Sequence, residues 1–273
     1  MELGIRLSAV AGMVQKGNCI ADIGCDHAFV SIALVQNGVS ERMIACDINK
    51  GPLEHAKDHI RMCELEDRIE TRLCDGLSGI KPGECDGGII AGMGGPLGLE
   101  ILYRGREVIR DWTQVVLQLQ SKLPLVRYVL KEWGFETVAE DMVFEDGKFY
   151  PIMRLSVPKK DFYEMEIADL NAYFDEMEEK LKGEPSEDVC AYTYGKLLLE
   201  NHSPILLAFL GKEETRLLEI AEKLDEAVPD GTAAGSVTGA EGSPVEAGNL
   251  KRIAEINAQM DTLMMAKWKL EGC

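Results

Sequence analysis

The feature that most constrains the fold is a regular alternation of short apolar runs and longer helix-like segments over the first 157 residues. Strands that alternate with helices pair in a parallel sheet whose two faces the helices cover. We therefore expect an α/β, Rossmann-like sheet. The predicted strands are residues 19–24, 43–48, 69–74, 87–92 and 114–120, and the predicted helices are about 28–37, 51–64, 96–110 and 122–132.

The end of this section follows a different pattern. Residues 135–157 contain two strand-like runs around Asp146-Gly147, and an Asp-Gly step is typical of a tight hairpin turn. A parallel sheet that ends in an antiparallel hairpin fits a methyltransferase-like Rossmann variant better than a plain dinucleotide-binding domain.

After Pro158 the strand signals stop, and the chain becomes rich in helix-forming residues. A Gly/Ala/Ser-rich segment near residues 229–248 cannot bury much apolar surface, so we predict a flexible loop there. The sequence thus predicts two domains, residues 1–157 and a helical, coiled-coil-like domain of residues 158–273. Its predicted helices are 161–182, 187–200, 204–228 and 248–271, and the last two form an antiparallel hairpin.

Composition narrows the class of protein. The net charge of −18 argues against a general nucleic-acid binder, although residues 1–157 carry only −6 of it and residues 158–273 carry −12. No apolar run approaches the roughly 20 residues that span a bilayer, and the N-terminus lacks the pattern of a secretion signal. Eight cysteines occur without a CxxC pair. These features predict a cytoplasmic protein with free thiols and no membrane segment.

The segment ADIGCDHAFVSI, residues 21–32, joins the first predicted strand to a helix. Gly24 keeps the first glycine of a dinucleotide-binding loop, but Asp26 and Ala28 occupy the next two glycine positions. Pyrophosphate requires a close backbone approach, and the carboxylate of Asp26 would repel it. S-adenosylmethionine carries a sulfonium cation and a zwitterionic amino-acid end instead of phosphate, so it tolerates carboxylates. The loop therefore favours this cofactor over NAD.

One acid follows each of the first three predicted strands, at the carboxyl edge where such sheets bind ligands. Asp22 is placed to approach the methionine ammonium, and Asp47 to bridge the ribose hydroxyls. Asp75 is placed to accept a hydrogen bond from the adenine amino group. The alternative is that these acids are helix caps or turn residues.

The fourth predicted strand ends in IIAGMGGPLG, residues 89–98. Gly92, Gly94 and Gly95 offer an open backbone wall, and Met93 adds a soft apolar side chain. Such a wall could accept a planar base beside the sulfonium. A tight turn without substrate contact is the alternative interpretation.

The histidines near the glycine loop and on the following helix allow more than one interpretation. His27 could contact cofactor or substrate, or could cap the turn by hydrogen bonding. His55, His59 and Cys63 follow a helical stripe, but three ligands over two turns of one helix cannot all reach one ion. We therefore expect no metal site.

Four stretches together resemble the bacterial tRNA (adenine-22-N1)-methyltransferases of the TrmK type: RLSAVAGMV, ADIGCDHAFVSI, IIAGMGG and EDMVFEDGKFYPIM. The resemblance implies a class I methyltransferase domain followed by a helical coiled-coil domain. It also implies S-adenosyl-L-methionine as cofactor and tRNA as partner. It places Asp22, Gly24, Asp26 and His27 in the cofactor pocket, and Arg6 near the methyl-transfer site.

The resulting site prediction has two parts. The catalytic set is Asp26, Gly92, Met93 and Gly94. The cofactor-binding set is Arg6, Asp22, Gly24, Cys25, Asp26, His27, Asp47, Ile48, Asp75, Gly76, Ala91, Gly92 and Met93.

The expected chemistry needs no general base, because adenine N1 carries a free lone pair at neutral pH. Catalysis would rest on alignment and on stabilising positive charge on the base, through Asp26 or a backbone carbonyl of residues 91–95. The target adenine would have to leave its stack. The alternatives are a small-molecule methyltransferase, an NAD-dependent oxidoreductase and a non-catalytic RNA-binding protein. The sequence leaves open whether the protein is a monomer or a homodimer.

Overall fold

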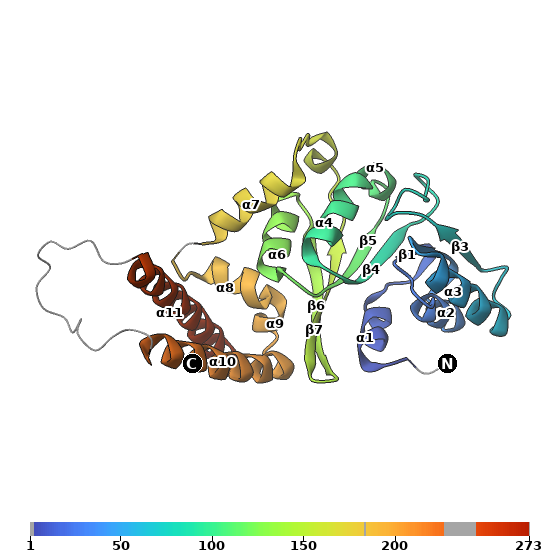
Figure 1. Cartoon of the computed structure of the whole chain (residues 1–273). Helices are drawn as coiled ribbons and strands as arrows, with labels where there is room; N and C mark the ends of the chain where they lie inside the picture. The colour runs from blue at the N-terminus through green and yellow to red at the C-terminus, as the bar shows by residue number, and fades with distance from the viewer. Residues whose placement is uncertain (1–2, 183, 227–243, 273) are drawn as a thin grey trace, which may run out of the picture. The chain divides into compact units, whose positions relative to one another are not determined.

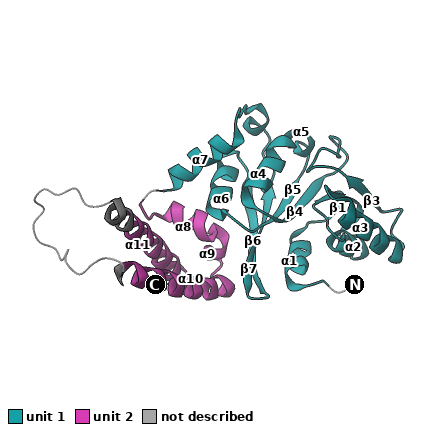
Figure 2. Ribbon diagram, viewed as in Figure 1, with its two compact units in different colours: residues 1–182 teal, residues 183–273 magenta. Residues whose placement is uncertain are grey.

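The computed structural model describes residues 3–182, 184–226 and 244–272, with only the backbone at 225–226 and 244–250 (Figure 1). The chain divides into two compact units, residues 1–182 and 183–273 (Figure 2). This division lies later than the boundary expected after residue 157. The reason is that Phe162, Phe174 and Met177 pack into the core of the first unit.

The first unit contains a seven-stranded sheet in the order β3-β2-β1-β4-β5-β7-β6. The first five strands are parallel, and β7 runs antiparallel to both β5 and β6. All five predicted parallel strands and the hairpin at Asp146-Gly147 are confirmed. The strands are β1 Gly17–Ile23, β2 Ser40–Asp47, β3 Ile69–Leu73, β4 Gly87–Met93, β5 Gln114–Leu119, β6 Glu136–Glu145 and β7 Lys148–Ser156.

Helices cover both faces of this sheet, as expected (Figure 1). One face packs on α1, α2 and α3, with Val10, Ile32 and Ile60 among the buried residues. The other face packs on α4, α6, η1 and α7. The helices are α1 Ile5–Met13, α2 Phe29–Gln36, α3 Lys50–Met62, α4 Gly95–Arg104, α5 Arg106–Ile109, α6 Leu123–Glu132, η1 Asp161–Glu164 and α7 Leu170–Leu181.

Two of the predicted helices in this unit are interrupted. The prediction of one helix over 96–110 is wrong, because the chain turns at Gly105, where a Cβ would collide with Leu77. The prediction of one helix over 161–182 is also wrong, because only a short 3-10 turn precedes a break. Helix α7 starts after Asp169, whose carboxylate caps the helix by accepting hydrogen bonds from the backbone N–H groups of Asn171 and Ala172.

The second unit is helical, with α8 Glu187–Tyr194, α9 Lys196–Glu200, α10 Pro204–Glu226 and α11 Pro244–Glu271. The predicted helix 187–200 is broken at Gly195, whose φ of 96° does not fit a helix. The antiparallel hairpin of α10 and α11 is confirmed. Lys267 pairs with Glu214 at 2.6 Å, while Leu224, further along α10, shares a pocket with Ile253, which comes earlier in α11.

Residues 229–243 of the predicted loop lie outside the described residues. Residues 244–248, which were also predicted to belong to the loop, form the start of α11 instead. Within the described ranges, no helix is both long and apolar enough to span a membrane. The order of the strands across the sheet reverses at β1, because β2 and β3 are added on one side of β1, whereas β4 and β5 are added on the other side. Ligands of open α/β sheets bind at the carboxyl ends of strands at such a switch point.

Candidate functional site

The loop after β1 lies at this switch point and is shaped by Gly24. Its φ is +74°, and its N–H and that of Cys25 both donate to the carbonyl oxygen of Cys46 at 2.9 Å. A Cβ at Gly24 would collide with the Cε of Met93 at the end of β4. The positive φ therefore favours glycine here, and any side chain would have to displace the flexible end of Met93.

The next residues of the loop turn without further glycines. Asp26 and Ala28 have φ of 51° and 58°, and the N–H of Ala28 donates to the carbonyl oxygen of Cys25 at 2.7 Å. The N–H of Asp26 points to Asp47 Oδ2 at 3.3 Å. A backbone donor that a dinucleotide loop would offer to phosphate is thus used within the protein.

Asp47 is fixed by two backbone donors. Besides Asp26, the N–H of Asn49 donates to Asp47 Oδ1 at 2.8 Å, and the residue is nearly buried. Each carboxylate oxygen has a second lone pair. The structure therefore brings the predicted Asp47 to the glycine loop with acceptor capacity left for a hydroxyl-bearing ligand.

Asp22 is buried beneath the loop and accepts a 2.7 Å hydrogen bond from Ser31 Oγ of α2. Burial raises the pKa of the Asp22 carboxyl to about 6, against the opposing effect of Ser31, and nearby Asp47 adds to the rise. A buried carboxylate without a cationic partner is costly. This position is therefore suited to a ligand that brings positive charge.

At the predicted glycine wall, the backbone at the end of β4 and the start of α4 lies close to the backbone that follows β5. The register shifts between Ala91 and Met93, and Gly92 has a φ of 80°. A Cβ at Gly95 would collide with the backbone of Ser121, whose Oγ accepts a hydrogen bond from the Gly95 N–H at 3.1 Å. Arg6 of α1 also reaches this wall, because its Nη1 lies 3.8 Å from the Cβ position of Gly92.

The ends of β2 and β3 form a separate, apolar part of the same edge. Ile48 follows β2 and is 61% exposed, and Leu73 is the last residue of β3 and is 48% exposed. The N–H of Cys74 donates to the Asp47 carbonyl oxygen at 3.0 Å, and the exposed Asp75 comes next. Gly76 follows with a φ of 53° and packs on Ile101. Sequence reasoning missed Leu73, although an apolar residue directly before the predicted Cys74-Asp75 edge was a usable signal.

His27 lies in an aromatic cluster. Its ring stacks on Phe29 at 5.4 Å between centroids and lies 5.4 and 5.6 Å from His55 and His59. The rings pack together, and in the described part of the chain no group of three or more His, Cys, Asp or Glu is arranged to hold a metal ion. The sequence placed His55 and His59 on a stripe of their own, and only the fold adds His27 to them.

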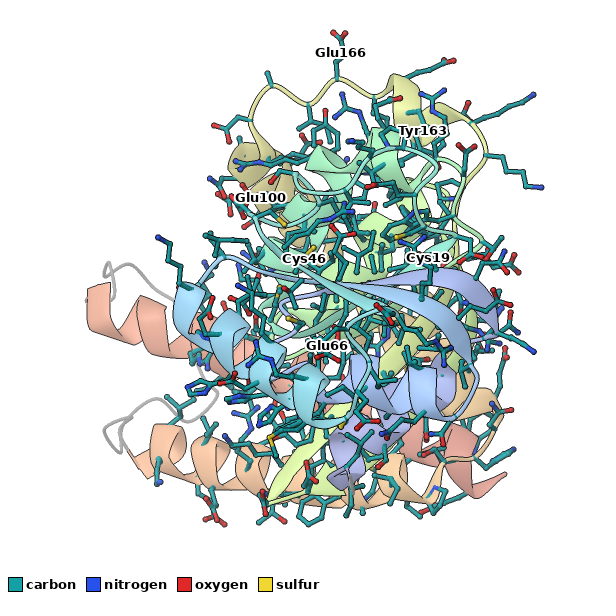
Figure 3. The ribbon with its side chains drawn as sticks, turned by 90° about the vertical axis from the view of Figure 1, so that its right-hand side faces the viewer. Cys19, Cys46, Glu66, Glu100, Tyr163 and Glu166 are labelled. Carbon is teal, nitrogen blue, oxygen red and sulfur yellow. The ribbon has the colours of Figure 1, made fainter. Side chains whose placement is uncertain are left out.

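Seven cysteines of the described residues are free, and Cys19 and Cys46 lie within the body of the first unit (Figure 3). Burial raises the pKa of the Cys25 thiol, and the thiol of Cys74 raises that of Cys46. The Cys46 contact lowers the pKa of Cys74 instead. Of these three thiols, Cys74 is the one whose lowered pKa favours the thiolate form.

Comparison with known proteins gives sequence matches over the first unit. A family model described as a methyltransferase domain matches residues 3–153. The tRNA (adenine(22)-N(1))-methyltransferase of Bacillus subtilis (strain 168) is 34% identical over 161 residues, which are 59% of this chain and 68% of that protein. The match to the family model includes the loop and the strand ends described above.

Solved structures extend the likeness to nearly the whole chain. The B. subtilis m1A22 tRNA methyltransferase TrmK has a TM-score of 0.72 at 26% identity, covering 97% of this chain and 99% of that one. A putative tRNA (m1A22) methyltransferase of Streptococcus pneumoniae, solved with S-adenosyl-L-methionine, has a TM-score of 0.70 at 23% identity, covering 97% and 100%. The chain therefore belongs to the methyltransferase-domain family and, within it, to the bacterial tRNA (adenine(22)-N(1))-methyltransferases of the TrmK family.

Proposed function

We propose that the protein transfers a methyl group from S-adenosyl-L-methionine to N1 of adenine 22 in bacterial tRNA. The observation that carries this proposal is the carboxylate-lined glycine loop. The Asp26 N–H is already used by Asp47, and buried Asp22 favours a ligand that carries positive charge. Such a loop suits a sulfonium cofactor and does not suit the pyrophosphate of NAD. Family membership supports the substrate, and a tRNA substrate implies a cytoplasmic enzyme.

The residues at the strand ends fit this cofactor. Asp22 takes the ammonium of the amino-acid end, and the free lone pairs of Asp47 accept from the ribose hydroxyls. Exposed Ile48 and Leu73 provide apolar contact for the adenine, beside Asp75. The remaining proposed contacts come from Arg6, Gly24, Cys25, Asp26, His27, Gly76, Ala91, Gly92 and Met93.

The reaction places few demands on side chains. The bound cofactor supplies a methyl group on a sulfonium, so neither a metal ion nor a general base is required. Gly92, Met93 and Gly94 form the wall against which the target base is aligned, and the end of the Met93 side chain lies against Gly24 of the β1 loop. The Asp26 side chain is 71% exposed, so water screens its field. The backbone carbonyls of residues 91–95 are therefore the stronger candidates for stabilising positive charge on the base.

Asp22 gives a pH-dependent prediction. Its folded-state pKa of about 6 exceeds the unfolded value of about 3.9, so its contribution to stability is complete below about pH 4 and is lost as pH rises through 6. Asp22→Asn should therefore raise the free energy of unfolding of the ligand-free protein by about 3 kcal/mol at pH 8, with little change at pH 4. Urea denaturation at both pH values measures this, with Asp75→Asn as an exposed control. An equal gain at both pH values would contradict the assignment.

The function is tested by methyl transfer from labelled S-adenosylmethionine to unmodified bacterial tRNA, with the product nucleosides resolved by mass. We expect N1-methyladenosine, and no label when adenine 22 of the transcript is replaced by guanine. Label that persists after this replacement would overturn the base position. Cofactor binding without any labelled tRNA would instead favour a small-molecule acceptor.

A further inference from the structure

Four neighbouring strands contribute one row of side chains at the carboxyl edge of the sheet. Ile20, Ile89, Val116 and Ile152 belong to the core on the α1 face. Side chains alternate between the faces of a sheet, so residues two positions away lie on the same face. This places a diagonal row on the α1 face across β1, β4, β5 and β7, formed by Asp22, Ala91, Gln118 and Tyr150. Ala91 pairs with Gln118, whereas Asp22 pairs with Ile89, two residues before Ala91.

Arg6 of α1 lies over one end of this row. Its Nη1 donates to Gln118 Oε1 at 3.0 Å, and its guanidinium carbon is 5.6 Å from the centre of the Tyr150 ring. Both partners are neutral. Among the ion pairs of the described residues none involves Arg6, so its positive charge is held in place but not cancelled.

Gln118 is fully buried, and its second amide atom, Nε2, has no hydrogen-bond partner. The amide cannot flip to improve this, because Nε2 would then face the donor of Arg6. A glutamate here would bind Arg6 more strongly and leave no orphaned donor, but it would neutralise the guanidinium. An unsatisfied buried amide of this kind requires an explanation, and keeping the charge of Arg6 available provides one.

We propose that Gln118 and Tyr150 are positioning residues that present the uncompensated charge of Arg6 to the α-carboxylate of S-adenosylmethionine. Asp22, at the other end of the row, takes the α-ammonium of the same amino-acid end. Ala91, which pairs with Gln118 in the β4–β5 ladder, leaves room between the two charges because its side chain is small. This inference rests on the proposed function and names how its site distinguishes a zwitterionic ligand from other adenosine derivatives.

A tRNA phosphate is the other anion that Arg6 could bind. The row favours the carboxylate, because it has an unpaired cation at one end and a buried acid at the other. An amino acid satisfies both ends, whereas a phosphate satisfies Arg6 alone and would be repelled by Asp22.

The experiment is calorimetric binding of three ligands to the full-length protein: S-adenosylmethionine, decarboxylated S-adenosylmethionine and 5′-methylthioadenosine. Wild-type protein should bind the first about 10- to 100-fold more tightly than the second. Gln118→Glu keeps the hydrogen bond to Arg6 but neutralises the charge of the guanidinium. The variant should bind S-adenosylmethionine more weakly by a similar factor. Its affinities for the decarboxylated ligand and for 5′-methylthioadenosine should stay unchanged.

Gln114→Glu is the matched control, because Gln114 lies on the same strand and face but bonds to the backbone of Gln15. It should lower stability without changing the ratio of ligand affinities. A Gln118→Glu protein that loses all three ligands equally would reduce Gln118 to a structural role and overturn the inference. Unchanged S-adenosylmethionine affinity with a raised KM for tRNA would overturn it in favour of a phosphate contact. Wild-type protein that binds none of the ligands would overturn the proposed function as well.

Discussion

Gly24→Val is expected to lower the affinity for S-adenosylmethionine by more than about 100-fold, an effect of about 3 kcal/mol. The φ of +74° at this position is unfavourable for a β-branched residue, and any Cβ would collide with Met93. The Val side chain must push the flexible end of Met93 aside, and it would occupy the space where the β1 loop and the end of β4 approach each other. Because that approach forms the centre of the site, cofactor binding should be lost, and calorimetry measures it directly.

Gly38→Val is the control that shows the effect of backbone strain alone, without a steric collision near the pocket. Gly38 has a similar φ of +66°, but nothing lies within 4 Å of its Cβ position. The variant should lose about 1 to 3 kcal/mol of stability and keep its cofactor affinity. If both variants bind S-adenosylmethionine equally well, the contact between Gly24 and Met93 does not shape the pocket.

Glu140→Gln is expected to lower the free energy of unfolding by about 3 to 5 kcal/mol. Glu140 of β6 accepts hydrogen bonds from Arg127 of α6, with Nη2 at 2.7 Å and Nε at 2.9 Å. The two side chains are 1% and 7% exposed. The substitution keeps the shape of the side chain but removes the negative charge that faces the buried guanidinium of Arg127. Removing one partner of a buried pair costs far more than the pair contributes. Chemical denaturation followed by circular dichroism gives the value.

Glu176→Gln is the surface control, because Glu176 pairs with Lys180 on an exposed face of α7. Water already solvates both charges, so we expect no measurable change in stability. Equal losses in the two variants would mean that burial does not decide the contribution of the Arg127 pair.

Much of the site could be predicted because its signals are local. An acid directly after an apolar strand must lie at the carboxyl edge of a parallel sheet, so Asp22 and Asp47 were placed correctly relative to the loop. The hairpin at Asp146-Gly147 was predictable for the same reason, since the turn chemistry and both strands are adjacent in the chain. The roles of Asp75 and Asp26 remain predictions, and both lie more exposed than Asp22.

The sequence by itself determined the strands, the order of strand and helix, and the chemistry of the glycine loop, because strand and helix periodicity and turn preferences act over a few residues. Only the tertiary structure decided the break at Gly105, where Leu77 lies against the backbone, and the later boundary between the units. It also decided that Arg6 meets Gln118 and Tyr150, residues more than a hundred positions away. Such contacts depend on which strands become neighbours in the sheet, and no local pattern in the chain records that choice.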